Sequence, residues 1–221
     1  MNKFLLPICS LLFLSTTVNG VEDKPKIVKM ISDEKIFGGS QLYFQTLSLI
    51  KKSYHEAGFE INLVNVPNER GFQMLLKGEV DADIGRMSIV IDKLNLNFVN
   101  VPLVELRYCL YSVHKTKGKE LEDASIIMVR GTQIPKVTKL KNITYADSLA
   151  QAIEILKKRS SIDYLFFIKE IYETSELSKN NQLNCVHLYE KLNAYHVLSE
   201  KKKYLIPILE PIFKKYFPLK I

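Results

Sequence analysis

Short runs rich in β-branched residues alternate with longer runs of helical periodicity in the first part of this 221-residue chain. The expected strands span residues 26–31, 59–66 and 80–87, and the expected helices span 40–57 and 68–76. Gly58 and Gly78 follow the two helices, where a left-handed residue commonly ends a helix. Strands separated by single helices pair in parallel with right-handed crossovers. The alternation therefore predicts a β-α-β-α-β unit whose ligand-binding edge lies at the carboxyl ends of its strands.

The same order of elements recurs further along the chain, although the residues themselves do not repeat. We expect strands at 103–113, 125–129, 162–168 and 188–198, a turn at 131–132, and helices at 147–158 and 203–215. Two small lobes joined by extended crossing segments accommodate both units. The sequence thus predicts an α/β, two-lobed fold with two small mixed sheets flanked by helices and two crossover strands as the hinge. The first lobe is expected at 21–103 and 189–221, and the second at 104–188.

The first 20 residues have the pattern of a cleavable export signal. Lys3 gives a positive start, and the apolar run at 4–14 is too short to cross roughly 30 Å of hydrocarbon. Val18 and Gly20 are the small residues expected before a cleavage site. A buried N-terminal helix or strand is the alternative, but Pro7 interrupts the run. We expect cleavage after Gly20 and a periplasmic mature protein, with no later stretch of about 20 apolar residues.

The charge of the chain is positive but spread out. Lys and Arg number 31 against 24 Asp and Glu, for a net charge of +7 and a pI near 9.1. The basic residues are spread along the chain with short clusters such as 201–203 and 214–215, which is typical of a solvated surface. A nucleic-acid-binding protein would show a basic stripe with interleaved aromatic residues, so no nucleic-acid partner is expected. An acidic ligand is compatible with this balance.

Two cysteines, Cys109 and Cys185, remain once the signal is removed, and they are 76 positions apart. They form either a disulfide in an oxidising compartment or two buried thiols, and the sequence leaves both open. The four histidines are dispersed, and no spacing of His, Cys, Asp or Glu indicates a metal site or a catalytic triad. We therefore expect neither a metal nor a cofactor.

Several local motifs resemble the extracellular solute-binding proteins of amino-acid ABC transporters, family 3. Residues 75–84 read Leu-Leu-Lys-Gly-Glu-Val-Asp-Ala-Asp-Ile and are similar to the family signature at the end of the second helix and the start of the third strand. Residues 156–164 resemble a degenerate second copy, 127–132 resemble the strand and turn that present amides to the ligand, and 195–199 resemble the return strand. The resemblance implies a monomeric binding protein for a small molecule, with a membrane permease or a sensor as its partner.

The segment at 86–93 departs from that family. Members that bind amino acids usually have an arginine at the last position, where it binds the ligand carboxylate, and Lys93 stands there in this chain. Lysine lacks the planar fork of arginine and cannot reproduce bidentate binding. Arg86 takes the place of a glycine at the carboxyl end of the third strand. It either binds the anionic group in place of the missing arginine or forms a structural ion pair with Asp83 or Asp92.

Other candidate ligand-binding residues lie at the same predicted edge. Arg70 opens the second helix, where it contacts ligand or pairs with the adjacent Glu69. Arg130, Gly131 and Thr132 follow a strand, as an anion-binding nest at a helix N-terminus or as a simple turn. Ser32, Asp33 and Glu34 follow the first strand at this edge, where one of them is expected to accept an amine or hydroxyl, and Glu34 is the best placed.

Three classes of function are compatible with these residues. The first is binding of a small polar ligand, anionic or amino-acid-like, between two lobes that close by a hinge motion. The second is a secreted interaction protein whose cleft binds no small molecule. The third is a dehydratase, because a few relatives of this fold are enzymes of that kind. A dehydratase would need a catalytic acid or base, for which Glu34 and Glu173 are available, but their spacing in the sequence does not indicate that they act as a pair. We expect no catalysis.

Overall fold

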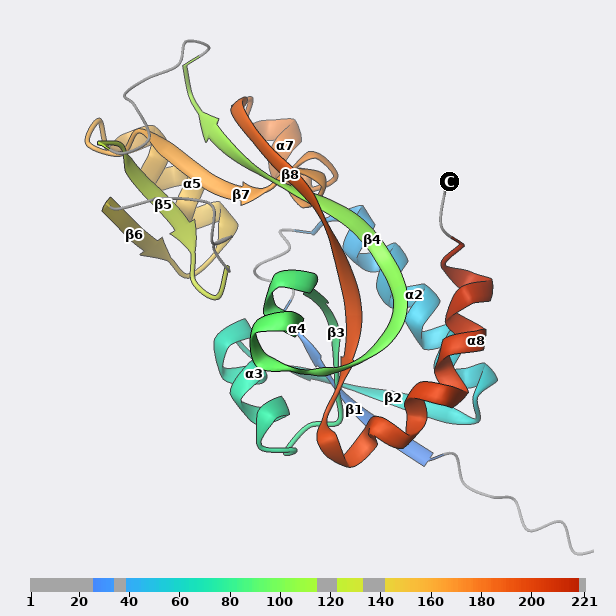
Figure 1. Cartoon of the computed structure of the whole chain (residues 1–221). Coiled ribbons are helices and arrows are strands. Elements are labelled where there is room, and N and C mark those ends of the chain that lie inside the picture. Colours follow the sequence, from blue (N-terminus) through green and yellow to red (C-terminus); the bar gives the residue numbers. More distant parts are fainter. Residues whose placement is uncertain (1–25, 34–38, 115–122, 133–141, 219–221) are drawn as a thin grey trace, which may run out of the picture.

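The computed structural model describes residues 26–33, 39–114, 123–132 and 142–218, and the expected export signal lies outside them (Figure 1). Its strands are β1 (Lys26–Ser32), β2 (Phe59–Asn65), β3 (Ala82–Met87), β4 (Asn97–Ser112), β5 (Ser125–Val129), β6 (Asn142–Ala146), β7 (Tyr164–Ile168) and β8 (Asn184–Leu198). Its helices are α2 (Gln41–Glu56), α3 (Asn68–Leu76), α4 (Ser88–Leu94), α5 (Leu149–Lys158), α6 (Lys169–Glu173), α7 (Glu176–Asn180), the 3₁₀ helix η1 (Glu200–Leu205) and α8 (Ile206–Tyr216). No helix within these ranges is long and apolar enough to cross a membrane.

The strands form one curled sheet in the order β2-β1-β3-β8-β4-β7-β5-β6. At each end three strands are parallel, with β1 between β2 and β3, and β5 between β6 and β7. The long antiparallel strands β4 and β8 run between the two ends (Figure 1). We call β1–β3 with α2, α3, α4, η1 and α8 the first lobe, and β5–β7 with α5, α6 and α7 the second lobe. The predicted two-lobed α/β fold is confirmed, and β4 and β8 join its two small sheets into a continuous one.

Local signals in the sequence explain the first helices. The Ser40 hydroxyl accepts a hydrogen bond from the Tyr43 amide at 3.4 Å and so caps α2, and Ser148 caps α5 in the same way. Gly58 and Gly78 have positive φ angles of 80° and 68°, as expected of residues that end a helix. Each of these helices is amphipathic, and its apolar face packs on the sheet of its own lobe.

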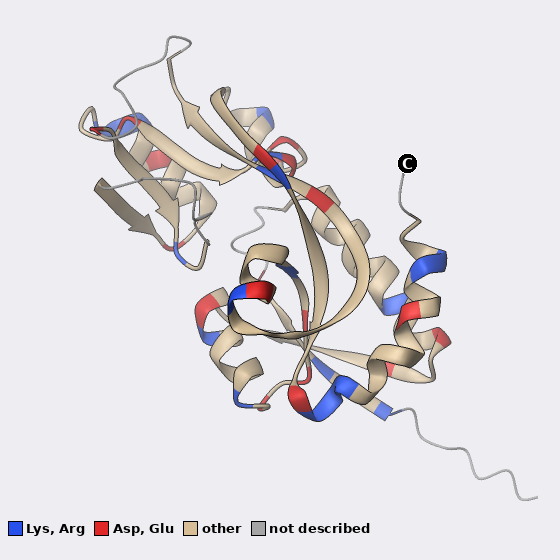
Figure 2. Cartoon of the chain, in the orientation of Figure 1, with Lys and Arg blue, Asp and Glu red and all other residues tan. Residues whose placement is uncertain are grey.

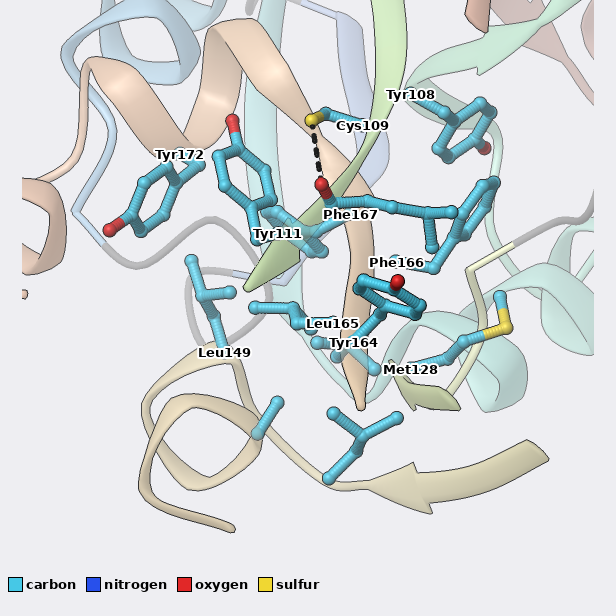
Figure 3. Close-up of a cluster of buried hydrophobic side chains, with 14 of the residues drawn as sticks. Tyr108, Cys109, Tyr111, Met128, Leu149, Tyr164, Leu165, Phe166, Phe167 and Tyr172 are labelled. Carbon is cyan, nitrogen blue, oxygen red and sulfur yellow. Dashed lines mark hydrogen bonds between the residues drawn. The ribbon is translucent and has the colours of Figure 1, made fainter. Parts of the chain in front are cut away.

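Each lobe has its own apolar core. Figure 3 shows part of the second, in which Tyr108 stacks on Phe166 with ring centroids 4.7 Å apart. Along β4 the side chains change from the first core to the second between Leu103 and Val104. On β8, Ala194 still packs in the second core. The lobe boundaries expected from the sequence stay a prediction, and this packing favours a later crossing on the return strand.

Equivalent aspartates tie the central strand of each lobe. The Asp81 carboxylate accepts a hydrogen bond from the Lys29 amide at 2.9 Å, at the junction of β1 and β3. In the second lobe, the Asp163 carboxylate accepts from the Ser125 amide at 2.8 Å, at the junction of β5 and β7. These two positions belong to the repeated family-like signature, and their side chains are structural in both lobes.

Cys109 on β4 and Cys185 on β8 form a disulfide, with their Cα atoms 5.9 Å apart. The bridge links the two crossing strands in the second lobe, where Tyr111 lies opposite Cys185 in the register. Cys109 is fully buried, whereas Cys185 is exposed. Of the two possibilities that the sequence left open, the structure has the disulfide.

Candidate functional site

A hollow of about 610 Å³ lies between the two lobes, at the carboxyl ends of β3 and β5. Its walls come from α3, β3 and α4 on one side, and from the turn after β5 and the strand β6 on the other. The residues that line it are Glu69, Phe72, Gln73, Arg86, Lys93, Arg130, Gly131, Thr132 and Tyr145. Five of the residues predicted from the sequence, Arg86, Lys93, Arg130, Gly131 and Thr132, thus lie around one hollow.

Two cations reach the hollow from opposite lobes. Lys93 is in the last turn of α4, and it makes no ion pair within the described part of the chain. Arg130 follows β5, where its Nε lies 3.2 Å from the Asp147 carboxylate and its guanidinium lies 5.9 Å from the Tyr145 ring centroid. Figure 2 shows basic residues on α4 and on the turn after β5. Because the Arg130 side chain is 56% exposed, its pair with Asp147 is weak and leaves it available to a ligand.

Arg86 is buried, with 7% of its surface exposed, and it has a structural partner. Its Nε donates to the Asp83 carboxylate at 2.7 Å, Nη2 contacts the same oxygen, and the guanidinium lies 4.5 Å from the Phe72 ring centroid. Of the partners considered from the sequence, Asp83 is therefore the one observed. Arg86 still lines the hollow, where its other N–H groups make no hydrogen bond to a described residue.

The turn after β5 touches the first lobe directly. The Asn68 side-chain amide donates to the Gly131 carbonyl at 3.3 Å, and Gly131 has a φ of 87°. A Cβ at this glycine would lie 3.1 Å from the Asn68 side chain. The amides of Arg130 and Thr132 bond to the Ala146 and Val129 carbonyls, which leaves the Gly131 amide as the one that could meet an anion. Residues 133–141, which would decide between an anion-binding nest at a helix N-terminus and a simple turn, lie outside the described part.

The other candidates lie elsewhere. Arg70 is on the exposed face of α3, away from the hollow, and pairs with no described carboxylate. Glu34 lies outside the described residues. Glu173, the candidate acid or base of the dehydratase hypothesis, pairs with Lys169 at 2.6 Å and lines a separate hollow between α2 and α6. In the described part of the chain, no three His, Cys, Asp or Glu side chains are grouped so that they could bind a metal.

Two smaller cavities of about 90 Å³ each lie near the hollow, one adjoining it and the other adjoining the first. The nearer one shares Arg86, Gly131 and Thr132 with the hollow, and its other walls are mainly apolar. The other shares Leu106, Ile171 and Ala194, among others, with the nearer, and the Asp33 and Asp83 carboxylates also line it. Burial raises the pKa of Tyr108, which lines the nearer cavity, so its phenol stays protonated.

Sequence reasoning missed several residues of the site, among them Asn68, Phe72 and Tyr145. Asn68 was treated only as the start of a helix, yet its amide donates to the Asp33 carboxylate at 2.6 Å and its side chain reaches the other lobe. Phe72 belongs to the helix expected at 68–76 and was not considered as a site residue, although it lines the hollow. Tyr145 lies on β6, a strand that was not expected; the alternation of Ile143 and Tyr145 with polar neighbours was the available signal.

No family model matches the sequence, and no curated protein matches it. Solved structures do match in fold. A truncated, arginine-bound form of ArgBP from T. maritima has a TM-score of 0.68 at 15% identity, covering 86% of this chain and 95% of that one. A Streptococcus pneumoniae ABC uptake transporter substrate-binding protein with bound histidine has a TM-score of 0.68 at 12% identity, with 87% of each chain covered. An ancestral amino-acid-binding protein described as a precursor of cyclohexadienyl dehydratase has a TM-score of 0.66 at 12% identity, covering 86% and 95%. The resemblance inferred from the motifs is thus confirmed for the fold.

Proposed function

We propose that this protein is an exported, monomeric solute-binding protein that holds a small anionic ligand between its two lobes, for transport or for sensing. The observation that carries the proposal is the hollow at the carboxyl ends of β3 and β5, with Lys93 and Arg130 on opposite sides of it. In α/β folds this edge is the usual place for a ligand. The neighbours in fold, described as amino-acid and ABC transporter binding proteins, support it.

An anion between Lys93 and Arg130 would contact both lobes and so favour their approach. Each cation is solvent-exposed, so a single ion pair is worth only about 0–1 kcal/mol, and binding must also draw on burial and on hydrogen bonds. Arg86 contributes differently. Because it is buried against Asp83, removing it would leave a buried carboxylate without its partner, at a cost of about 3–5 kcal/mol.

Export is supported by two independent features. The first is the signal-like N-terminus with expected cleavage after Gly20. The second is the Cys109–Cys185 disulfide, because disulfides persist mainly in oxidising compartments such as the periplasm. A mature protein that begins at Val21 in the periplasmic fraction would confirm both cleavage and location by N-terminal mass spectrometry. A membrane permease or a sensor is the partner we propose.

The test is thermal unfolding of residues 21–221 against organic acids, amino acids, polyamines and short peptides. A ligand at about 100 times its dissociation constant should add about 2.7 kcal/mol of stability. For a chain of this size that raises Tm by about 5–10 °C. Lys93→Met should weaken binding of the ligand about fivefold to tenfold, which corresponds to about 1 kcal/mol. Lys52→Met, which removes the same charge from the exposed face of α2, is the matched control and should bind as the parent does.

Other outcomes identify the competing functions. No saturable shift with any probe would reject solute binding and favour a secreted interaction protein. Chemical conversion of a bound compound would indicate an enzyme instead. Arg86→Ala is an unsuitable first test, since loss of its ion pair would lower stability whether or not it contacts ligand.

A further inference from the structure

We infer that the contact between Ser40 and Thr174 is a latch that holds the two lobes together directly, whatever lies between them. Ser40 caps α2 in the first lobe, Thr174 follows α6 in the second, and their hydroxyl oxygens are 2.7 Å apart. The inference concerns the motion of the lobes, so it goes beyond the proposed function and depends on no class of ligand.

The first turn of α2 meets the end of α6 across the lobe boundary. The first N–H groups and the last C=O groups of a helix have no partner within that helix. Here the Gln41 amide, which begins α2, donates to the carbonyl of Thr174, the residue that follows α6, at 3.0 Å. The two helix ends therefore satisfy each other, and separating the lobes would leave both groups to water.

A chain of hydroxyl groups strengthens this contact. The Thr174 hydroxyl donates to the Glu170 carbonyl at 2.7 Å. Because a hydroxyl has a single proton, the Thr174 oxygen then accepts the hydrogen bond from Ser40. The Ser40 oxygen in turn accepts from the Tyr43 amide at 3.4 Å, and Ser40 is fully buried. Each of the two hydroxyls thus bonds within its own lobe and across the boundary.

Both sides of the contact are fixed to their own lobes. The Glu170 carboxylate accepts from the Arg107 amide at 2.7 Å and from Arg107 Nε at 2.8 Å, which ties α6 to the second-lobe part of β4. On the other side, Ser40 is held as the cap of α2. Leu42 on α2 adds an apolar contact, because it packs against the core of the second lobe. A rotation of one lobe away from the other would therefore break these contacts, so their free energy favours the closed form.

The latch lies outside the candidate site. Neither Ser40 nor Thr174 lines the hollow at the carboxyl ends of β3 and β5 or the two smaller cavities. The contact between Asn68 and Gly131, by contrast, lies at that hollow. An apparent dissociation constant contains the fraction of molecules that can bind. Two residues remote from the hollow would thus help to set the affinity for any ligand that the closed lobes hold.

The test measures the distance between the lobes by double electron–electron resonance on residues 21–221 with no added ligand. Spin labels are placed through Arg70→Cys on α3 and Ala150→Cys on α5, two exposed positions on different lobes. The native cysteines are paired in a disulfide and take no label. We expect the short distance of the closed lobes in the parent. In Thr174→Val the ratio of short to long distances should fall about threefold to tenfold, the usual effect of losing one hydrogen bond.

Two controls separate the latch from a purely structural role. Thr174→Ser keeps the hydroxyl and should restore the distance ratio of the parent. Ser178→Ala removes a hydroxyl that bonds only to the Glu173 and Ser175 carbonyls of its own lobe, and should leave the ratio unchanged. Thermal unfolding confirms that each variant is folded.

Two results would overturn the inference. One is a parent that shows only long distances, because the latch would then not hold the lobes. The other is an equal distance ratio in the parent and in Thr174→Val, which would mean that the contact persists as the lobes move or contributes nothing. Either result leaves the proposed solute binding standing, since no ligand takes part in the measurement.

Discussion

The Cys109–Cys185 disulfide should account for a large part of the stability of the mature protein. It closes a loop with a sequence separation of 76, for which the chain-entropy relation gives about 4.5 kcal/mol at 25 °C. Measured effects are commonly about 2–4 kcal/mol, because the unfolded chain is less free than the relation assumes. The matching variant is Cys109→Ala with Cys185→Ser, since Cys109 is buried and Cys185 is exposed. We expect it to unfold about 5–15 °C below the parent.

Differential scanning calorimetry with and without a phosphine reductant provides the assay. The reductant should lower Tm of the parent to near that of the double variant, and should leave the variant unchanged. Thiol titration in denaturant should find no free thiol in the oxidised mature chain and two after reduction, because its only cysteines are these two. A loss below about 1 kcal/mol on breaking the bridge would refute the loop-closure reasoning.

Three further predictions follow from other residues. Gly131→Ala should lower the unfolding free energy by about 1–2 kcal/mol because of its positive φ, and should also weaken ligand binding because the new Cβ meets Asn68. Gly58→Ala has a similar φ but no neighbouring atom, so it should lose stability only. Equal ligand binding by both variants would contradict this reasoning. Asp163→Ala removes the carboxylate that accepts a hydrogen bond from the amide at the start of β5, and should lower the unfolding free energy by about 1–3 kcal/mol in urea titrations. An unchanged unfolding free energy would mean that water replaces the carboxylate as the acceptor. Burial lowers the pKa of His196 to about 4 from 6.5, so between these values the unfolded chain binds a proton that the folded chain does not. The unfolding free energy should therefore fall by about 2–3 kcal/mol as the pH drops from 7.5 to 4.5. His196→Gln should lose most of this pH dependence.

The fold followed from the sequence where local signals and long-range packing agree. Alternating strands and helices with glycine ends predicted the first three strands and the helices between them within a few residues. Short elements were missed. Helix α4 has seven residues, begins without a side-chain cap and packs on β3 and β8. The expected helix at 203–215 is a 3₁₀ helix followed by α8. Such short segments have too little hydrophobic periodicity for the sequence to predict their secondary structure, because tertiary contacts determine it.

The candidate site was predictable in part, for a topological reason. Lys93 and Arg130 are far apart in sequence, yet each follows a strand whose carboxyl end faces the same hollow. The rule that ligands bind at this edge therefore brought them together. The rule does not say which side chains are already engaged. Nothing in the sequence decided whether Arg86 would pair with Asp83, since that choice depends on the depth at which β3 is buried.

The residues that hold the fold are different from those that line the hollow, which explains how this fold can persist at 11–15% identity to its structural neighbours. The lobes are held by buried side chains, by the β4–β8 pair and by strand ties such as that of Asp163, none of which depends on the ligand. Under the proposed function, ligand recognition would depend instead on the residues that line the hollow, such as the exposed Lys93. Exposed cations can change at little cost to folding, since surface substitutions usually shift stability by less than about 0.5 kcal/mol. Lys93 is an exposed cation of this kind, so the scaffold would tolerate a change there, and a ligand of the proposed function is best sought from the chemistry of this chain's own hollow.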